Sequence, residues 1–412
     1  MTETEAFSIV SMGAQGDGLT ANGDFAPLTL PGESIRAVFD KGRAEAVEIL
    51  HASPDRVIAP CRHFGDCGGC SLQHWATEPY LAWKVDLIRQ ALARVDIETD
   101  ILPPFAAPPG SRRRLALHAR RLGRSVVVGF KARRSWRLAP IENCEIADPR
   151  LNQALPMLRR LADAFLEHPK SAPTLHATVT ETGLDIDVTG VERRAGGLSA
   201  DARMRAASIA GEADVARVSL AGEIVYQARP AVVLMGGASV ALPAGAFLQA
   251  APQAEQAMAA FIIEAAAGAR RLADLYCGVG AFTFPLARLA PVLAADASAA
   301  AIASLRAAVG TLPGVSPIEA MVRDLDRRPV LAMELKKVDV VVFDPPRAGA
   351  AVQAGEIGRS VVPRAVAVSC NLATFVRDAK ILTDAGFRLD RVLPVDQFLW
   401  SPHIELVGIF SR

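Results

Sequence analysis

Aromatic residues are scarce in this chain: they make up 6% of its 412 residues, with three tyrosines and four tryptophans. The N-terminus, M-T-E-T-E-A-F-S, lacks a basic segment followed by an apolar run, so we expect no secretory signal. An uncharged stretch over residues 230–254 is broken by three prolines and three glycines, which argues against a membrane-spanning helix there. We therefore expect a soluble, cytoplasmic protein with no membrane partner.

Net charge is also nearly absent, because 45 basic residues are balanced by 44 acidic ones. A net charge of +1 gives no electrostatic indication of a partner for the molecule as a whole. The apolar fraction of 51% is ample for buried cores, and the length predicts two to four domains. We expect the protein to act as a monomer.

Cysteines number only six, and they fall into two groups. Cys61, Cys67 and Cys70 form a C-x5-C-x2-C triplet with one distant partner, Cys144. In a reducing compartment such clustering favours a metal or cluster site over disulfides. Cys370, in contrast, stands alone in V-S-C-N. The sixth, at position 277, belongs to a glycine turn.

The distribution of turns and apolar runs divides the chain into three parts. Residues 5–52 are short apolar runs separated by G-A-Q-G-D-G, A-N-G-D and L-P-G-E, which predicts a small β-barrel. A cysteine-bearing loop over 53–75, an amphipathic helix from Thr77, a hairpin over 112–131 and further helices and strands predict a central α/β region to about residue 245. From about residue 246, strands and helices alternate, which predicts an open, mostly parallel sheet.

A glycine turn over residues 274–280, D-L-Y-C-G-V-G, follows one expected strand and precedes a helix. Glycines let the backbone approach a ligand closely, and Asp296 ends the next strand, where a ribose hydroxyl would be held. Asp274 inside the turn suits a ligand with a positive amino group better than a pyrophosphate, which favours S-adenosylmethionine over NAD. The alternative is an ordinary tight turn between a strand and a helix.

Two further expected strands are each followed by a residue that can take part in catalysis or ligand binding. The apolar strand 338–343 leads into D-P-P-R, where Asp344 could bond a substrate or cofactor or merely cap a helix. Cys370 ends the following strand, and the helix expected over 373–385 would lower its pKa toward a thiolate. The alternative for Cys370 is a buried, inert thiol. Close to the C-terminus, Glu405 or His403 could serve as a base.

These motifs, D-L-Y-C-G-V-G-A-F, D-P-P-R-A-G, V-S-C-N-L-A-T and D-Q-F-x3-P-H-I-E, occur in the order seen in RNA uracil-5-methyltransferases, which the chain resembles. The resemblance implies that Cys370 adds to C6 of uracil and that Glu405 removes the C5 proton. It also implies that Asp344 orients base and cofactor, and that S-adenosylmethionine is bound by residues including Gln249, Tyr276 and Asp296.

The resemblance also extends to the other two parts of the chain. It implies an OB/TRAM-like β-barrel over 1–52, a central α/β domain over 53–245, and a Rossmann-like methyltransferase domain over 246–412. The central domain would hold a 4Fe-4S cluster on Cys61, Cys67, Cys70 and Cys144. Tetrathiolate zinc is the alternative, but zinc sites usually offer paired C-x2-C elements, and here only one such pair occurs.

Several positions depart from the family pattern: Ala251, Ala367 and Leu372 replace an asparagine, a tyrosine and a proline, and Phe398-Leu399 stands where F-P is usual. The barrel is also short. These departures leave the expected chemistry intact and bear on the choice of substrate.

RNA is the expected partner, because basic residues crowd one segment without an acid between Ser111 and Leu138. They are Arg112, Arg113, Arg114, Arg120, Arg121, Arg124, Lys131, Arg133, Arg134 and Arg137, with Phe130 and Trp136 among them. In the family that the chain resembles, members with a cluster and a barrel more often act on large-subunit ribosomal RNA, so the resemblance implies 23S rRNA, with tRNA as the alternative. A flavin- or NAD-linked iron–sulfur oxidoreductase and a non-catalytic RNA-binding scaffold are the competing classes.

Overall fold

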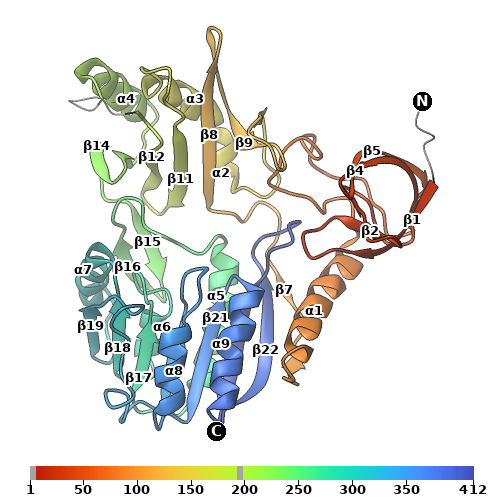
Figure 1. The fold of residues 1–412 in the computed structure, drawn as a ribbon. Helices are drawn as coiled ribbons and strands as arrows, with labels where there is room; N and C mark the ends of the chain where they lie inside the picture. The colour runs from red at the N-terminus through yellow and green to blue at the C-terminus, as the bar shows by residue number, and fades with distance from the viewer. Residues whose placement is uncertain (1–5, 193–197) are drawn as a thin grey trace.

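The computed structural model describes residues 6–192 and 198–412, which form a barrel, a central sheet and a large C-terminal sheet (Figure 1). None of the helices in these two ranges is long and apolar enough to cross a membrane.

The N-terminal strands close into a barrel in the order β1-β2-β3-β5-β4. They are β1 (Ala6–Met12), β2 (Gly18–Thr20), β3 (Phe25–Ala26), β4 (Ser34–Asp40) and β5 (Arg43–His51). Alternation places apolar side chains such as Ile9 and Ile35 in the barrel interior, where both are at most 2% exposed.

The central sheet has seven strands in the order β10-β9-β8-β11-β12-β13-β14. They are β8 (Arg114–Leu122), β9 (Ser125–Lys131), β10 (Leu138–Pro140), β11 (Thr174–Thr180), β12 (Gly183–Thr189), β13 (Arg217–Leu220) and β14 (Glu223–Gln227). Three helices pack on this sheet: α2 (Pro149–Gln153), α3 (Leu155–Ala164) and α4 (Ala200–Glu212). The helices α2 and α3 follow each other directly, and each has a proline in its first turn.

The C-terminal sheet has nine strands, with the main path β19-β18-β17-β20-β21-β23-β22-β6 and β7 beside β22. Its C-terminal strands are β17 (Leu272–Leu275), β18 (Val292–Asp296), β19 (Ile318–Val322), β20 (Val340–Phe343), β21 (Arg364–Ser369), β22 (Arg388–Asp396) and β23 (Glu405–Ser411). The strands from β19 to β21 are parallel, and β23 runs antiparallel to both of its neighbours. The alternating β/α pattern therefore produces the open, mostly parallel sheet that the sequence predicts.

Helices cover both faces of this sheet, so its strands are apolar on both sides. One apolar cluster contains residues of α5 (Pro252–Ala265) and α6 (Thr283–Ala287), and a neighbouring one contains residues of α7 (Ala299–Ala308), the η1 turn that follows it (Val309–Thr311) and the hairpin of β15 (Val232–Met235) and β16 (Ala238–Ala241). The opposite face is covered by α8 (Ala351–Arg359), α9 (Leu372–Asp384) and α1 (Thr77–Ala93).

The predicted boundaries 53–245 assigned the helix α1 and the two short strands after it to the central domain. In the structure these elements pack on the C-terminal sheet instead. Ile88 and Leu92 of α1 are fully buried in the core of the C-terminal sheet. β6 (Asp100–Ile101) and β7 (Phe105–Ala106) pair in parallel with β22. Figure 1 shows α1, in orange, lying close to β22, in blue, although they are far apart in sequence. Residues 77–107 thus complete the C-terminal domain.

Candidate active site

The carboxyl ends of the parallel strands bring the expected site residues to one edge of the C-terminal sheet. Asp296 is the last residue of β18, Asp344 follows β20 directly, and Cys370 follows β21. Glu405 is the first residue of the antiparallel strand β23 and pairs with Val395 of β22. Because parallel strands end together, residues separated by more than a hundred positions meet where open α/β sheets bind their ligands.

Two glutamine side chains connect the two expected carboxyl groups. Gln249 Nε2 donates to Asp344 Oδ2 at 3.0 Å, and Gln397 Nε2 donates to Gln249 Oε1 at 2.7 Å. The same Gln397 amide donates to Glu405 Oε2, also at 2.7 Å. Gln397 is itself oriented, because its Oε1 accepts the Ala250 N–H at 2.8 Å. The sequence identified Gln249 but not Gln397, whose position in D-Q-F was the only signal.

Burial controls the acidity of both carboxyl groups. It raises the pKa of Asp344 to about 7. It raises the pKa of Glu405 to about 8, and the negative charge of Asp344 adds to that effect. The hydrogen bond from Gln397 and the charge of Arg347 oppose the increase. A carboxyl group that exchanges its proton near neutral pH is suited to general-base chemistry.

The Cys370 thiol is half-buried and lines a cavity of about 580 Å³, together with Lys84, Arg347 and His403. Burial raises its pKa, and the charge of Glu405 raises it further. The expectation that the following helix would lower this pKa is wrong. Asn371 caps α9 by accepting the Ala373 N–H at 3.1 Å, so Cys370 lies before the cap, and desolvation dominates.

Arg347 is the group that favours the thiolate form of Cys370. Its charge and its hydrogen bond both lower the pKa of the thiol, against the larger effect of burial. The D-P-P-R turn is held to the thiol turn because Asn371 Nδ2 donates to the Arg347 carbonyl at 3.0 Å. This cation was not predicted from the sequence, although its position in the D-P-P-R turn after a strand was a usable signal.

The glycine turn is built around two aspartates. Asp296 Oδ2 accepts the Gly278 N–H at 2.9 Å, and Tyr276 takes a left-handed backbone with φ of 61°. Asp274 is fully buried and accepts the Thr283 hydroxyl through Oδ2, whereas its Oδ1 has no hydrogen-bond partner. Burial raises the pKa of Asp274 to about 7. An unpaired acidic oxygen under a glycine turn fits a ligand with a positively charged amino group, as S-adenosylmethionine has.

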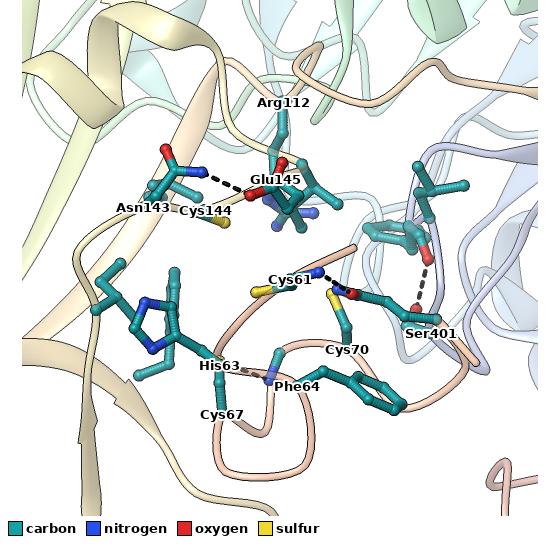
Figure 2. Close-up of a pocket in the computed structure, with 18 of the residues that line it drawn as sticks. Cys61, His63, Phe64, Cys67, Cys70, Arg112, Asn143, Cys144, Glu145 and Ser401 are labelled. Atoms are coloured by element: carbon teal, nitrogen blue, oxygen red, sulfur yellow. Dashed lines mark hydrogen bonds between the residues drawn. The ribbon is translucent and has the colours of Figure 1, made fainter. Parts of the chain in front are cut away.

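The four clustered cysteines line a second cavity, of about 310 Å³, whose walls come from the loop 52–76, the central domain and the C-terminal domain, which contributes Arg347, Phe398 and His403 among others. Figure 2 shows Cys61 and Cys70 on this loop, with Cys144 opposite them. Burial raises the pKa of Cys70 to about 12 and that of Cys144 to about 11. Over residues 6–192 and 198–412, no group of three or more His, Cys, Asp or Glu side chains is arranged to hold a single metal ion.

The basic segment is not one exposed patch. Arg113 is 6% exposed and pairs with Glu255 of α5, and its Nε donates to the Gln249 carbonyl at 2.9 Å. It therefore positions a site residue and cannot contact RNA phosphates. Asp17 of the barrel pairs with Arg133 at 2.5 Å. Exposed basic side chains remain at the β8–β9 hairpin and the β9–β10 loop; they are Arg120, Arg121, Arg124, Arg134 and Arg137.

Trp136 is the exposed aromatic residue of this segment. Its side chain is 76% exposed, and the Lys131 ammonium lies 4.0 Å from its ring centroid. An aromatic ring on a basic loop is the arrangement that stacks with unpaired bases.

Comparison with known proteins agrees with this geometry. A family model described as tRNA (Uracil-5-)-methyltransferase matches residues 239–412, which contain all of the sheet-edge residues above. A Caulobacter vibrioides protein named as an uncharacterized RNA methyltransferase is 62% identical, over 98% of this chain and 99% of that protein. The 23S rRNA (uracil(1939)-C(5))-methyltransferase RlmD of Alkalilimnicola ehrlichii is 30% identical, over 98% and 96% of the two chains.

Among solved structures, the tRNA (uracil-54, C5)-methyltransferase of Pyrococcus abyssi, in complex with S-adenosyl-L-homocysteine, has the same fold. The two superimpose with a TM-score of 0.76 at 21% identity, over 99% of this chain and all of that one. Family membership decides against an oxidoreductase and a non-catalytic scaffold. The chain belongs to the family of S-adenosylmethionine-dependent RNA (uracil-5-)-methyltransferases.

Proposed function

We propose that this enzyme transfers a methyl group to C5 of a uridine in RNA through a temporary bond between Cys370 and C6 of the base. The observation that carries the proposal is the grouping of a half-buried thiol, the Arg347 cation and a buried carboxyl group whose charge acts on that thiol. A nucleophile, a group that stabilises its anion and a nearby base are the elements of covalent catalysis.

The chemistry follows from the base. Uracil C5 is a weak nucleophile, and addition of the Cys370 thiolate to C6 creates an enolate that makes C5 reactive. S-adenosylmethionine, when bound, supplies an electrophilic methyl group. Glu405 then accepts the C5 proton, the C5–H electron pair forms the C5–C6 double bond, and the sulfur leaves C6 as a thiolate. Arg347 stabilises that thiolate at both ends of the cycle.

Five residues at the sheet edge would hold the methyl donor: Gln249, Asp274, Tyr276, Asp296 and Asp344. The unpaired Oδ1 of Asp274 suits the amino group, and Asp296 lies where a ribose hydroxyl is held in such folds. Asp344 is bonded to Gln249 and charge-coupled to Glu405, so it can orient both base and donor.

The decisive experiment uses RNA that contains 5-fluorouridine. A fluorine at C5 cannot be removed as a proton, so the covalent intermediate between Cys370 and the methylated base accumulates. We expect a band that migrates as protein plus RNA on denaturing gels and requires the methyl donor. A folded, RNA-bound preparation that forms no such band would overturn the proposal.

A 4Fe-4S cluster on Cys61, Cys67, Cys70 and Cys144 is the proposed occupant of the second cavity. Four thiols from two distant segments line it, and the role is structural, because methyl transfer requires no electron. Tetrathiolate zinc requires all four sulfurs at about 2.3 Å from one ion. Anaerobic purification followed by iron and sulfide analysis distinguishes the two, with four irons per chain expected and zinc alone contradicting the proposal.

The proposed substrate is 23S rRNA. The full-length relative from Alkalilimnicola ehrlichii is named for that substrate, and the exposed arginines and Trp136 suit an unpaired RNA segment. A tRNA is the second candidate, because the architecture of the whole chain is shared with the Pyrococcus abyssi tRNA enzyme. Mass spectrometry of both RNA classes, from cells with and without the gene, shows which one loses 5-methyluridine.

A further inference from the structure

The loop that joins β22 to β23, residues 397–404, leads directly into Glu405, the proposed base. Trp400 in this loop adopts φ of 58°, a left-handed conformation that is uncommon for a bulky residue. An irregular loop needs partners for its backbone groups outside the sheet ladder. In this protein several of those partners come from residues 71–84, more than 300 positions earlier in the sequence.

Two side chains of α1 hold both ends of the loop. The Tyr80 hydroxyl donates to Asp396 Oδ2 at 2.6 Å and accepts the Trp400 N–H at 3.0 Å. Lys84 Nζ donates to Asp396 Oδ1 at 2.8 Å and to the His403 carbonyl at 2.6 Å. The side chains of Lys84 and Asp396 are both 0% exposed. This is a fully desolvated ion pair whose spare hydrogen bonds are directed at the loop.

The segment that follows Cys70 holds the middle of the same loop. The N–H groups of Ser71 and Leu72 both donate to the Trp400 carbonyl, at 2.9 and 3.0 Å. Leu72 is fully buried, so this contact is enclosed in the protein. The cysteine-bearing loop is therefore hydrogen-bonded to the loop that leads to Glu405 through the Trp400 carbonyl.

These anchors lie next to the groups that orient the base. Asp396 precedes Gln397, which donates to Glu405 at 2.7 Å, and His403 is two residues before Glu405. Cys370, in contrast, follows β21, and Asn371 beside it bonds to the Arg347 carbonyl, whereas the Tyr80 and Lys84 bonds above go to Asp396 and the loop. Loosening the loop should disturb the base more than the nucleophile.

We propose that Tyr80 and Lys84 are positioning residues for Glu405 and act on the step that releases the product. This inference rests on the proposed function. Glu405 takes the C5 proton, the freed electron pair forms the C5–C6 double bond, and the C6–sulfur bond breaks to return the Cys370 thiolate. A displaced carboxylate slows this step, while addition of the thiol and methyl transfer proceed.

The test is Tyr80→Phe, which removes one hydroxyl and keeps the buried ring. With ordinary uridine RNA and methyl donor, we expect turnover to fall about 10- to 100-fold, because a misplacement of about 1 Å can cost about 100-fold. The fraction of enzyme trapped as methylated covalent adduct should rise severalfold. With 5-fluorouridine RNA, which has no C5 proton, the rate of trapping should stay within about twofold of wild type, because no base is required.

The matched control is Tyr226→Phe, which removes a tyrosine hydroxyl from β14 in the central domain and should change neither quantity. A second variant, Lys84→Met with Asp396→Leu, replaces the buried pair by apolar side chains, a change that proteins often tolerate, and should show the same accumulation of adduct. Thermal denaturation shows that each variant is folded.

The positioning role would be overturned if Tyr80→Phe lowered turnover on uridine RNA and trapping on 5-fluorouridine RNA by the same factor. It would also be overturned if the covalent adduct on uridine RNA did not increase. Absence of any adduct between wild-type enzyme and 5-fluorouridine RNA would instead overturn the proposed function, so the two failures are distinguishable.

Discussion

The two sites that contain cysteines are built in different ways. Cys370 follows β21, a strand with hydrogen-bonded neighbours on both sides, β20 and β23, so the sheet itself places the thiol. The four clustered cysteines lie outside named strands and helices and are held by individual bonds, such as Cys61 N–H to Gln73 Oε1 at 3.1 Å and Cys144 N–H to Asn152 Oδ1 at 2.8 Å. A site at a strand end is formed by the fold, whereas a site between loops depends more on its ligand.

Replacing the strand-end thiol should remove chemistry and leave the fold intact. We expect Cys370→Ser to lower the rate of methyl transfer by on the order of 10⁴-fold or more, as loss of a nucleophile does in other covalent enzymes. The side chain is only half-buried, so the thermal midpoint should change little. Measured 5-methyluridine formation checks the first expectation and thermal denaturation checks the second. Substantial remaining activity would mean that another group is the nucleophile.

The pH of the solution should have the next largest effect on the rate of methyl transfer, because it changes the protonation of Glu405 at the strand-end site. Because the pKa of Glu405 is raised to about 8, the proposed base is mostly protonated at pH 6. The rate should therefore rise about tenfold per pH unit up to about pH 8, under conditions where proton removal limits turnover.

Stability should change with pH in the opposite direction. The folded pKa of Glu405 lies above its ordinary value of 4.5, so its contribution is complete below that value and is lost as the pH rises through about 8. Replacing Gln397 by methionine removes a bond that lowers this pKa, so the activity profile should move to higher pH. A profile that does not move would remove Glu405 from the role of base.

At the cysteine cavity, in contrast to the strand-end site, a substitution should lower stability more than methyl transfer. We expect Cys144→Ser to reduce bound iron and to lower the thermal midpoint by several degrees, at about 2–4 °C per kcal/mol of lost stability. The rate of methyl transfer should fall only to the extent that the substitution also loosens the loop 397–404, which is bonded to the segment after Cys70. Iron analysis, calorimetry and activity on the same preparation check this. Complete loss of activity with unchanged stability would mean that the cavity takes part in the chemistry.

The sequence predicted the placement of Asp296, Asp344 and Cys370 at strand ends because the signals for that placement are local. Apolar runs such as residues 338–343 followed by D-P-P-R place a residue at a sheet edge without knowledge of distant contacts. It could not predict that Lys84 is buried, since a lysine on an amphipathic helix usually points to water and its partner Asp396 lies 312 positions away. For the same reason Arg113 was counted with the basic residues expected to contact RNA, although it pairs with Glu255 in the interior.

The smallest changes in stability should come from substitutions of the exposed arginines on the central sheet. Arg124 is exposed, in contrast to Arg113, which is buried. Arg124→Ala, at the tip of the β8–β9 hairpin, should change the free energy of unfolding by less than about 0.5 kcal/mol. Glu255→Gln, which leaves the Arg113 charge uncompensated, should cost about 3–5 kcal/mol.

Arg124 and Arg113 should also differ in their contribution to RNA affinity. Each phosphate contact that is lost lowers the slope of log affinity against log salt by about one, so Arg124→Ala should flatten the salt dependence without affecting methyl transfer at saturating RNA. Binding measured at several salt concentrations tests this. An unchanged slope would show that the hairpin tip does not touch the RNA, and the search for the RNA surface would then move to Trp136 and the neighbouring loop, where a loss of stacking would lower affinity at every salt concentration equally.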